Sequence, residues 1–179
     1  MTERRFQGPF GRLRSPERLA RLEVGWVAER LAGDLTRPRV LDVGTGTGVF
    51  AEAFQPYGEV VGADVNAAML EAARELLPEI TFVQAEAERL PFPDHSFDLV
   101  FLGHVLHEAT DPVQALRESR RVGRGRVGVL EWPFREEPQG PPLAHRLRPE
   151  TVRTLAAEAG FSAVREEPLT SMVLYVLEG

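Results

Sequence analysis

The strongest chemical signal in the chain is a short apolar segment that runs into three glycines at alternate positions. The segment reads Val40-Leu41-Asp42-Val43 and continues as Gly44-Thr45-Gly46-Thr47-Gly48. Glycine has no Cβ, so the chain can turn sharply there and a ligand can lie against the backbone. The N–H groups that open the following helix then face that ligand. The segment predicts a ligand-binding turn between a strand and a helix; a tight turn without a ligand is the alternative.

An acidic residue follows the next predicted strand at the distance that a bound nucleoside requires. Asp64 ends the apolar run over residues 59–64, about twenty residues after the glycines. A carboxylate at this place can accept both hydrogen bonds from a ribose diol. The residues Gln84-Ala85-Glu86-Ala87 follow the third predicted strand, and His104 follows the fourth. Ligands of open α/β sheets bind outside the carboxyl ends of the strands, so these segments are expected to converge.

The elements that must position these residues alternate between strands and helices, which indicates a parallel sheet built from βαβ units. Strands are predicted over residues 40–43, 59–64, 80–83, 97–102, 126–131, 161–167 and 171–177. Helices are predicted over 15–33, 48–54, 66–77, from 111 onward with Asp111 as cap and Gln114 as capping-box partner, and over 149–159. The last two strands are expected to form an antiparallel hairpin, because the three residues between them cannot hold a parallel crossover.

These motifs resemble class I S-adenosylmethionine-dependent methyltransferases. Gly48 follows Gly46 by two residues, where the dinucleotide fingerprint requires three. The stretches Leu90 to Val100, Gly103 to Pro112 and Leu130-Glu131-Trp132 look like the small-molecule branch of the family, typified by ubiquinone and menaquinone methyltransferases (methyltransferase type 11). The resemblance covers roughly residues 38–179. It implies an α/β fold, a Rossmann-like three-layer sandwich whose seven-stranded sheet has the order 3-2-1-4-5-7-6 with strand 7 antiparallel.

The resemblance also implies S-adenosylmethionine as cofactor and S-adenosylhomocysteine as product. Glu86 would accept from the adenine amino group, although the family typically has Gly-Asp-Ala where this chain has Ala85-Glu86-Ala87. Met69 would pack on the adenine, a core methionine being the alternative. Asp42 would both organise the turn and face the ammonium of the cofactor. The expected cofactor-binding residues are Asp42, Gly44, Thr45, Gly46, Gly48, Asp64, Val65, Met69, Ala85, Glu86, Ala87, Gly103 and His104.

A catalytic base is optional in such an enzyme. A sulfonium already carries an excellent leaving group, so alignment supplies most of the acceleration, and a base serves only an alcohol or a carbon acid. His107 and Glu131 are the catalytic candidates, with His104 and His145 as further possibilities. The alternatives are a helix surface for His107, an arginine ion pair for Glu131 and a solvated loop for His145. No metal site is expected.

Composition restricts the partners. The net charge of −6 gives nucleic acid no general attraction, and the five arginines between Arg117 and Arg126 are interpreted as a basic helix C-terminus. The Asn-Pro-Pro-Tyr type of motif of base methylases is absent after the fourth strand, so the expected acceptor is a small molecule. The chain has no cysteine, which excludes disulfides and the thiolates that arsenite methylation uses. No apolar run approaches the ~18–20 residues of a membrane span, so a cytoplasmic monomer or homodimer is expected.

Several interpretations remain open at this point. We expect one domain over residues 1–179, with an N-terminal arm and helix over 1–37 and the Rossmann-like core over 38–179. Phe6, Phe10 and Arg14 of the arm are possible lid contacts, and the proline-rich loop 132–148 is where acceptor specificity is expected. The alternatives to a methyltransferase are a non-catalytic S-adenosylmethionine-binding module, a subunit that needs a partner, and a nicotinamide-dependent oxidoreductase with an altered turn.

Overall fold

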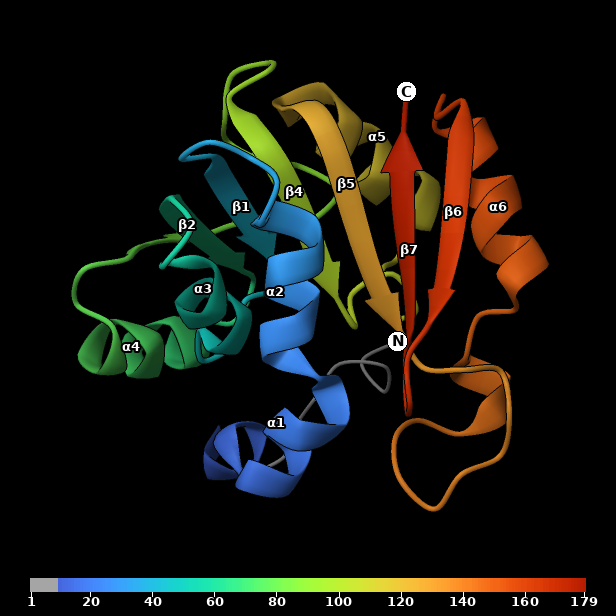
Figure 1. Ribbon diagram of the computed structural model, residues 1–179, viewed down its shortest axis with the longest axis horizontal. Helices are drawn as coiled ribbons and strands as arrows, with labels where there is room; N and C mark the ends of the chain where they lie inside the picture. The colour runs from blue at the N-terminus through green and yellow to red at the C-terminus, as the bar shows by residue number, and fades with distance from the viewer. Residues whose placement is uncertain (1–9) are drawn as a thin grey trace.

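A seven-stranded sheet with helices on both faces forms the molecule in the computed structural model, which describes residues 10–179 apart from the side chains of residues 10 and 12 (Figure 1). The strands are β1 (Arg39–Val43), β2 (Glu59–Asp64), β3 (Thr81–Gln84), β4 (Phe97–Gly103), β5 (Gly123–Glu131), β6 (Ala163–Pro168) and β7 (Val173–Glu178). The helices are η1 (Phe10–Arg14), α1 (Pro16–Leu22), α2 (Val24–Ala32), α3 (Val49–Phe54), α4 (Ala67–Leu76), α5 (Pro112–Val122), η2 (Leu143–His145) and α6 (Pro149–Glu158). The order β3-β2-β1-β4-β5-β7-β6, with β7 antiparallel to its neighbours, confirms the predicted fold class.

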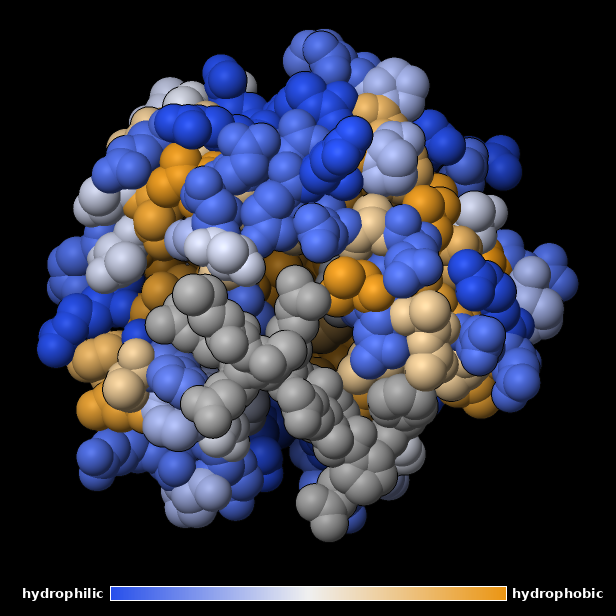
Figure 2. Space-filling view, turned by 180° about the vertical axis from the view of Figure 1, so that it is seen from behind, coloured by the Kyte–Doolittle hydropathy of each residue, from blue (hydrophilic) through white to orange (hydrophobic). Residues whose placement is uncertain are grey.

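Two hydrophobic cores lie on opposite faces of this sheet because successive strand residues point to opposite sides. Val40 and Phe101 pack with α2, α3 and α4 on one face. Leu41 and Val100 pack with α5 and α6 on the other. Hydrophilic residues predominate on the surface seen from behind (Figure 2). Trp26 and Leu76 are the large hydrophobic side chains that stay exposed among residues 10–179.

The predicted helix over residues 15–33 is wrong in one respect, because the chain breaks into α1 and α2 at Glu23. Glu23 has a left-handed φ of 47°, which costs a non-glycine residue roughly 1–2 kcal/mol. Its carboxylate accepts hydrogen bonds from the backbone N–H and the hydroxyl of Thr170, in the turn between β6 and β7. This tertiary contact outweighs local helix propensity. As a result α1 turns away from α2 and lies below the carboxyl ends of the strands (Figure 1).

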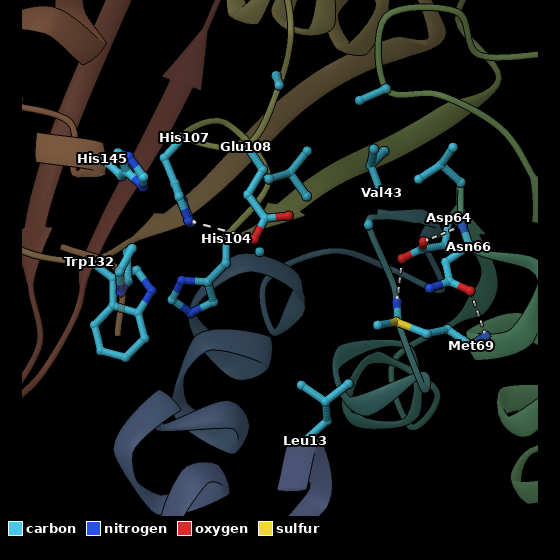
Figure 3. Close-up of a pocket in the computed structure, with 18 of the residues that line it drawn as sticks. Leu13, Val43, Asp64, Asn66, Met69, His104, His107, Glu108, Trp132 and His145 are labelled. Atoms are coloured by element: carbon cyan, nitrogen blue, oxygen red, sulfur yellow. Dashed lines mark hydrogen bonds and ion pairs between the residues drawn. The ribbon is translucent and has the colours of Figure 1, made fainter. Parts of the chain in front are cut away.

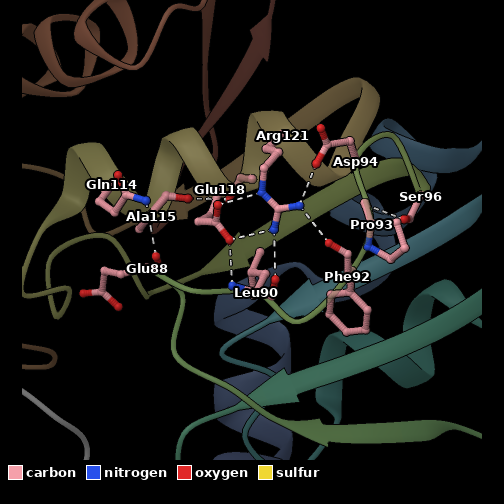
Figure 4. Close-up of polar contacts among 11 residues, drawn as sticks. Glu88, Leu90, Phe92, Pro93, Asp94, Ser96, Gln114, Ala115, Glu118 and Arg121 are labelled. Atoms are coloured by element: carbon pink, nitrogen blue, oxygen red, sulfur yellow. Dashed lines mark hydrogen bonds and ion pairs between the residues drawn. The ribbon is translucent and has the colours of Figure 1, made fainter.

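Two further predictions are corrected. Asp111 caps α5 by accepting from Gln114 N–H at 2.9 Å, but its own N–H donates to Glu88 Oε1 at 3.3 Å, so no capping box forms. The Gln114 amide donates instead to the Glu88 carbonyl at 3.4 Å (Figure 4). Strand β5 begins at Gly123, earlier than predicted, because Gly123 pairs with Phe97 across a register shift.

Arg121 of α5 makes several contacts with the loop after β3. The Arg121 guanidinium donates to the carbonyls of Leu90 and Phe92 and to the carboxylates of Asp94 and Glu118 (Figure 4). Arg121 lies in the last turn of α5, where a basic residue also complements the helix dipole. Part of the predicted basic helix C-terminus therefore fixes the loop between β3 and β4.

Candidate functional site

A cavity of about 560 Å³ lies at the carboxyl ends of β1, β2, β3, β4 and β5. This is the edge of the sheet at which ligands of open α/β folds bind. Of the predicted site residues, the following line it: Gly44, Gly46, Asp64, Val65, Met69, Ala85, Glu86, Ala87, Gly103, His104 and His107. Asp42, Thr45, Gly48 and Glu131 do not line it and lie directly behind its wall.

Asp64 organises one end of the cavity (Figure 3). Its Oδ2 accepts from Gly46 N–H at 2.8 Å and its Oδ1 accepts from Asn66 N–H at 2.8 Å. Each carboxylate oxygen can accept a second hydrogen bond, so a diol can still bind to both. Asp64 therefore fixes the glycine turn and stays available to a ligand, which fits the predicted grip on a ribose.

Met69 lies against the same end of the cavity. Asn66 caps α4 by accepting from the Met69 N–H at 3.3 Å, which places Met69 in the first turn of the helix. A Cβ built on Gly46 would lie 3.6 Å from the Met69 sulfur and 3.9 Å from Leu13. Both side chains also line the cavity, so they provide an apolar surface beside the glycine turn. This position fits the predicted packing on an adenine.

Asp42, Thr45 and Gly48 support the turn from behind. Thr45 Oγ1 donates to Asp42 Oδ2 at 2.7 Å, and both side chains are buried. Burial raises the pKa of Asp42 to about 7, although hydrogen bonds from Thr45 and the Ala51 backbone oppose the rise. A Cβ on Gly48 would lie 2.6 Å from Leu77 Cδ1, so this glycine serves close packing. The direct ligand contact of these three residues stays a prediction.

His107 and Glu131 form a buried pair at the other end of the cavity. His107 lies in a turn after β4, not on a helix surface, and its Nδ1–H donates to Glu131 Oε2 at 2.7 Å. The His107 backbone N–H donates to Glu131 Oε1 at 3.1 Å, so the carboxylate holds both backbone and ring. Burial lowers the pKa of His107, but the charge and hydrogen bond of Glu131, with Glu108, outweigh burial and raise it above the ordinary value. Nε2 lies 3.8 Å from Glu108 Oε1.

His104 stands between the two ends with its imidazole beside Trp132 (Figure 3). The two ring centroids are 5.2 Å apart. Neither ring nitrogen has a hydrogen-bond partner among residues 10–179. Burial, followed by the charges of Arg18 and His107, holds the pKa of His104 well below its ordinary value, so the ring is neutral. A neutral imidazole with unused nitrogens offers one donor and one acceptor to a ligand.

The proline-rich loop after β5 closes this second end. Gly140, Pro141, Pro142 and His145 line the cavity, and His145 is partly exposed there. The loop is held by Arg146, whose guanidinium lies 5.2 Å from the Trp132 ring. Arg146 donates to the carbonyls of Pro133, Arg135, Gln139 and Pro141 and to the Glu137 carboxylate. Its side chain is 1% exposed.

Arg14 of the N-terminal arm lies elsewhere than predicted. Arg14 donates to the Thr47 carbonyl at 2.8 Å and pairs with Glu52 of α3, so it does not line the cavity. Leu13 lines it instead, together with Arg18 and Arg21 of α1. Phe6 and the side chain of Phe10 lie outside the described residues. Sequence reasoning missed Arg18, Arg21 and Arg146, because no motif marks them.

Two searches of residues 10–179 bear on other classes of protein. No helix there is both long and apolar enough to span a bilayer. No group of three or more His, Asp or Glu side chains in the same residues is arranged to hold a metal ion.

Part of this chain is similar in sequence to known proteins. Residues 41–126 match the family described as methyltransferase domain. The chain is 49% identical over 105 residues to a ubiquinone/menaquinone biosynthesis C-methyltransferase of Hahella chejuensis, covering 52% of this chain and 42% of that protein. It is 43% identical over 117 residues to the enzyme of the same description from Pseudomonas savastanoi, covering 59% and 46%. The chain thus spans less than half the length of these relatives.

A solved structure agrees over nearly the whole fold. The structure of a SAM-dependent methyltransferase from Aquifex aeolicus superposes with a TM-score of 0.82 and covers 94% of this chain and 95% of that one. At 23% sequence identity this likeness establishes the fold alone.

Proposed function

We propose, from the premise that residues 41–126 form a methyltransferase domain of the S-adenosylmethionine-dependent type, that this chain transfers a methyl group from S-adenosylmethionine to a small-molecule acceptor. The observation that carries the proposal is one cavity with two chemically different ends. Asp64 and the glycine turn lie at one end, and His107 with its Glu131 partner lies at the other. A volume of about 560 Å³ falls within the range of small-molecule sites.

The first end suits an adenosyl group. Asp64 would bind the ribose hydroxyls with its remaining acceptor capacity, and Met69 would cover one face of the adenine. Glu86 lines the cavity on the loop after β3 and would accept from the adenine amino group. Gly44 and Gly103 would let the amino-acid part of the cofactor lie against the backbone.

The second end can align an acceptor and remove its proton. S-adenosylmethionine supplies a methyl group on a sulfonium sulfur, which keeps the electron pair of the breaking S–C bond. His107 Nε2 would take the proton from the acceptor atom as the new bond to the methyl carbon forms. Glu131 fixes the tautomer, because its Oε2 accepts the proton on Nδ1 and leaves Nε2 as the base. His104 would orient the acceptor through its unused ring nitrogens.

The shape of this end supports an acceptor with an apolar part. Trp132, Pro141 and Pro142 provide apolar surface beside the two histidines. The curated relatives are described as C-methyltransferases, and a carbon acid is an acceptor that needs a base such as His107. We therefore favour carbon, or an acidic hydroxyl, as the acceptor atom.

The test is binding followed by transfer. Calorimetry with S-adenosylhomocysteine and with NADH as control is expected to give binding of the first only. Methyl-labelled S-adenosylmethionine is then incubated with fractionated small metabolites, and label is expected in a low-molecular-mass product. Binding of NADH in place of the nucleoside would overturn the assignment. Cofactor binding without transfer to any fraction would favour the non-catalytic module.

A further inference from the structure

Two arginines of α1 line the cavity, and their guanidinium groups have no hydrogen-bond partner in the part of the chain that the structure describes. Arg18 and Arg21 both line it. Within residues 10–179 neither guanidinium makes a hydrogen bond or an ion pair to a carboxylate. Other arginines near the site have partners: Arg146 contacts four carbonyls and a carboxylate, and Arg14 contacts a carbonyl and a carboxylate. Two like charges at the wall of a cavity, with no hydrogen-bond or ion-pair partner within residues 10–179, therefore need an explanation.

The two charges also act against one another. Arg18 and Arg21 are three residues apart, which places them on the same face of a helix, where like charges destabilise it. Burial, and then the charge of Arg21, lowers the pKa of Arg18, and Glu108 compensates in part. The position of α1 below the strand ends is fixed by Glu23, which has a left-handed backbone conformation and contacts Thr170. The two arginines therefore stay close together in spite of their repulsion. Strain of this kind is retained where function requires it.

Arg18 lies near the acceptor end of the cavity, and Arg21 follows it three residues later on the same face of α1. The charge of Arg18 acts on His104, which contacts Trp132 and lies 6.4 Å from His107 between ring centroids. A bound cofactor would gain little from two more positive charges. S-adenosylmethionine carries two positive charges, on its sulfonium and ammonium groups, and one negative charge, on its carboxylate. The cavity lining already supplies the acidic side chains of Asp64 and Glu86.

We propose that Arg18 and Arg21 bind an anionic group, a carboxylate or a phosphate, carried by the methyl acceptor. This inference rests on the proposed methyltransferase function. Guanidinium groups hold such anions by paired, charge-assisted hydrogen bonds. The acceptor would thus place its anionic group at α1, its apolar part on Trp132, and its nucleophilic atom at His107. The cofactor's own carboxylate has the same chemistry, and the arms of the experiment separate these two sources.

The first arm measures the cofactor with the double variant Arg18→Gln/Arg21→Gln. S-adenosylhomocysteine and 5′-methylthioadenosine, which lacks the amino-acid part, are titrated by calorimetry into wild type and variant. Both affinities are expected to change less than about threefold. A loss for S-adenosylhomocysteine alone would assign the arginines to the cofactor carboxylate and overturn the proposal. No nucleoside binding by the wild type would instead refute the proposed function.

The second arm measures the anion on the S-adenosylhomocysteine complex, with benzoate and phenyl phosphate as probes and benzamide as the neutral control. At least one anion is expected to bind the wild type, more weakly at high salt, and to lose at least about tenfold in affinity in the double variant, as charge-assisted hydrogen bonds require. The double variant Arg37→Gln/Arg120→Gln, which removes the same charge from two exposed arginines outside the cavity, is expected to bind like wild type. Equal binding of anions and benzamide, or an equal loss in both double variants, would overturn the proposal.

A fold control completes the test. Removing two unpaired like charges relieves repulsion, so the melting temperature of Arg18→Gln/Arg21→Gln is expected to equal or exceed that of wild type. The charge-preserving Arg18→Lys/Arg21→Lys variant is expected to recover part of the anion affinity. A double glutamine variant that unfolds would mean that the arginines have structural partners, which also contradicts the proposal.

Discussion

Gly46 and Gly48 occupy similar backbone conformations, but alanine at the two positions should have different effects. Gly48→Ala should mainly lower stability, and Gly46→Ala should mainly lower cofactor affinity. Their φ angles are 55° and 81°, in the left-handed region that costs a non-glycine residue roughly 1–2 kcal/mol. A Cβ on Gly46 would meet the Met69 sulfur at 3.6 Å, an ordinary contact. A Cβ on Gly48 would meet Leu77 Cδ1 at 2.6 Å and Phe82 Cζ at 3.2 Å, so both of these core side chains must shift to make room for it.

The expected magnitudes follow from these contacts. Gly46→Ala keeps only the backbone cost, partly offset by the reduced entropy of the unfolded chain, so its free energy of unfolding falls by about 1 kcal/mol. Gly48→Ala has the same net backbone cost of about 1 kcal/mol and adds an overpacking cost of about 1–3 kcal/mol, giving a total of about 2–4 kcal/mol. At roughly 2–4 °C per kcal/mol for a chain of this size, the melting temperature of Gly48→Ala falls by several degrees more.

The affinity for the cofactor should fall more in Gly46→Ala than in Gly48→Ala, which is the reverse of their order in loss of stability. The new methyl group of Gly46→Ala stands beside Met69 and Leu13, which line the cavity, and narrows the space for the nucleoside. Calorimetry with S-adenosylhomocysteine at a temperature where both variants are folded is expected to show a loss of about tenfold or more for Gly46→Ala, equivalent to about 1.4 kcal/mol. Gly48→Ala should stay close to wild type. If Gly48→Ala lost affinity and Gly46→Ala did not, the assignment of the cavity wall would be refuted.

Three more predictions concern the buried polar groups. The pKa of Asp42 is 3.8 in the unfolded chain and about 7 in the folded protein. The stabilisation by protonated Asp42 is therefore fully present below pH 3.8. It is lost as the pH rises through 7, which lowers the free energy of unfolding by up to about 4 kcal/mol. Asp42→Asn should therefore be more stable than wild type in urea unfolding at pH 8 but not at pH 4; parallel profiles would contradict this. His107 must be neutral to act as a base, so the activity rises with pH through its raised pKa, and Glu131→Gln should move this rise to lower pH in a kcat/KM profile. A shift to higher pH would exclude the pair from proton transfer. Arg146→Leu leaves four carbonyls without their donor and should lower the free energy of unfolding by about 2–4 kcal/mol, with faster hydrogen exchange in residues 133–146. Unchanged exchange would show that the loop does not depend on Arg146.

The sheet, and the position of Asp64 and the glycine turn at its edge, could be predicted from the sequence because their signals are local. Asp64 and the glycine turn lie at the ends of neighbouring parallel strands, and the β1–β2 register from Arg39↔Glu59 to Val43↔Ala63 brings them together. The break at Glu23 could not be predicted, because it depends on Thr170, which lies 147 residues further along the chain. Arg146 could not be recognised either, since most of its partners are backbone carbonyls and these leave no mark in a sequence.

His107 and Glu131 illustrate an intermediate case. Each was a candidate by residue type, but their pairing depends on the register in which Gly103 lies beside Leu130 in the parallel strands β4 and β5. The implied strand order placed β4 next to β5, so the pair was within reach of sequence reasoning. The interpretation of Glu131 as an arginine partner is corrected, because its carboxylate is bound to the backbone and ring of His107.

The two ends of the cavity therefore differ in how far they can be inferred from relatives. The family match covers residues 41–126, which include Asp64, Glu86 and His107. Arg18, Arg21, Trp132 and His145, which we propose to contact the acceptor, lie outside that segment and come from α1 and from the loop after β5. Similarity over the matched segment consequently supports the cofactor but does not determine the acceptor. The acceptor must be identified from the charges and the loop that this chain places around His107.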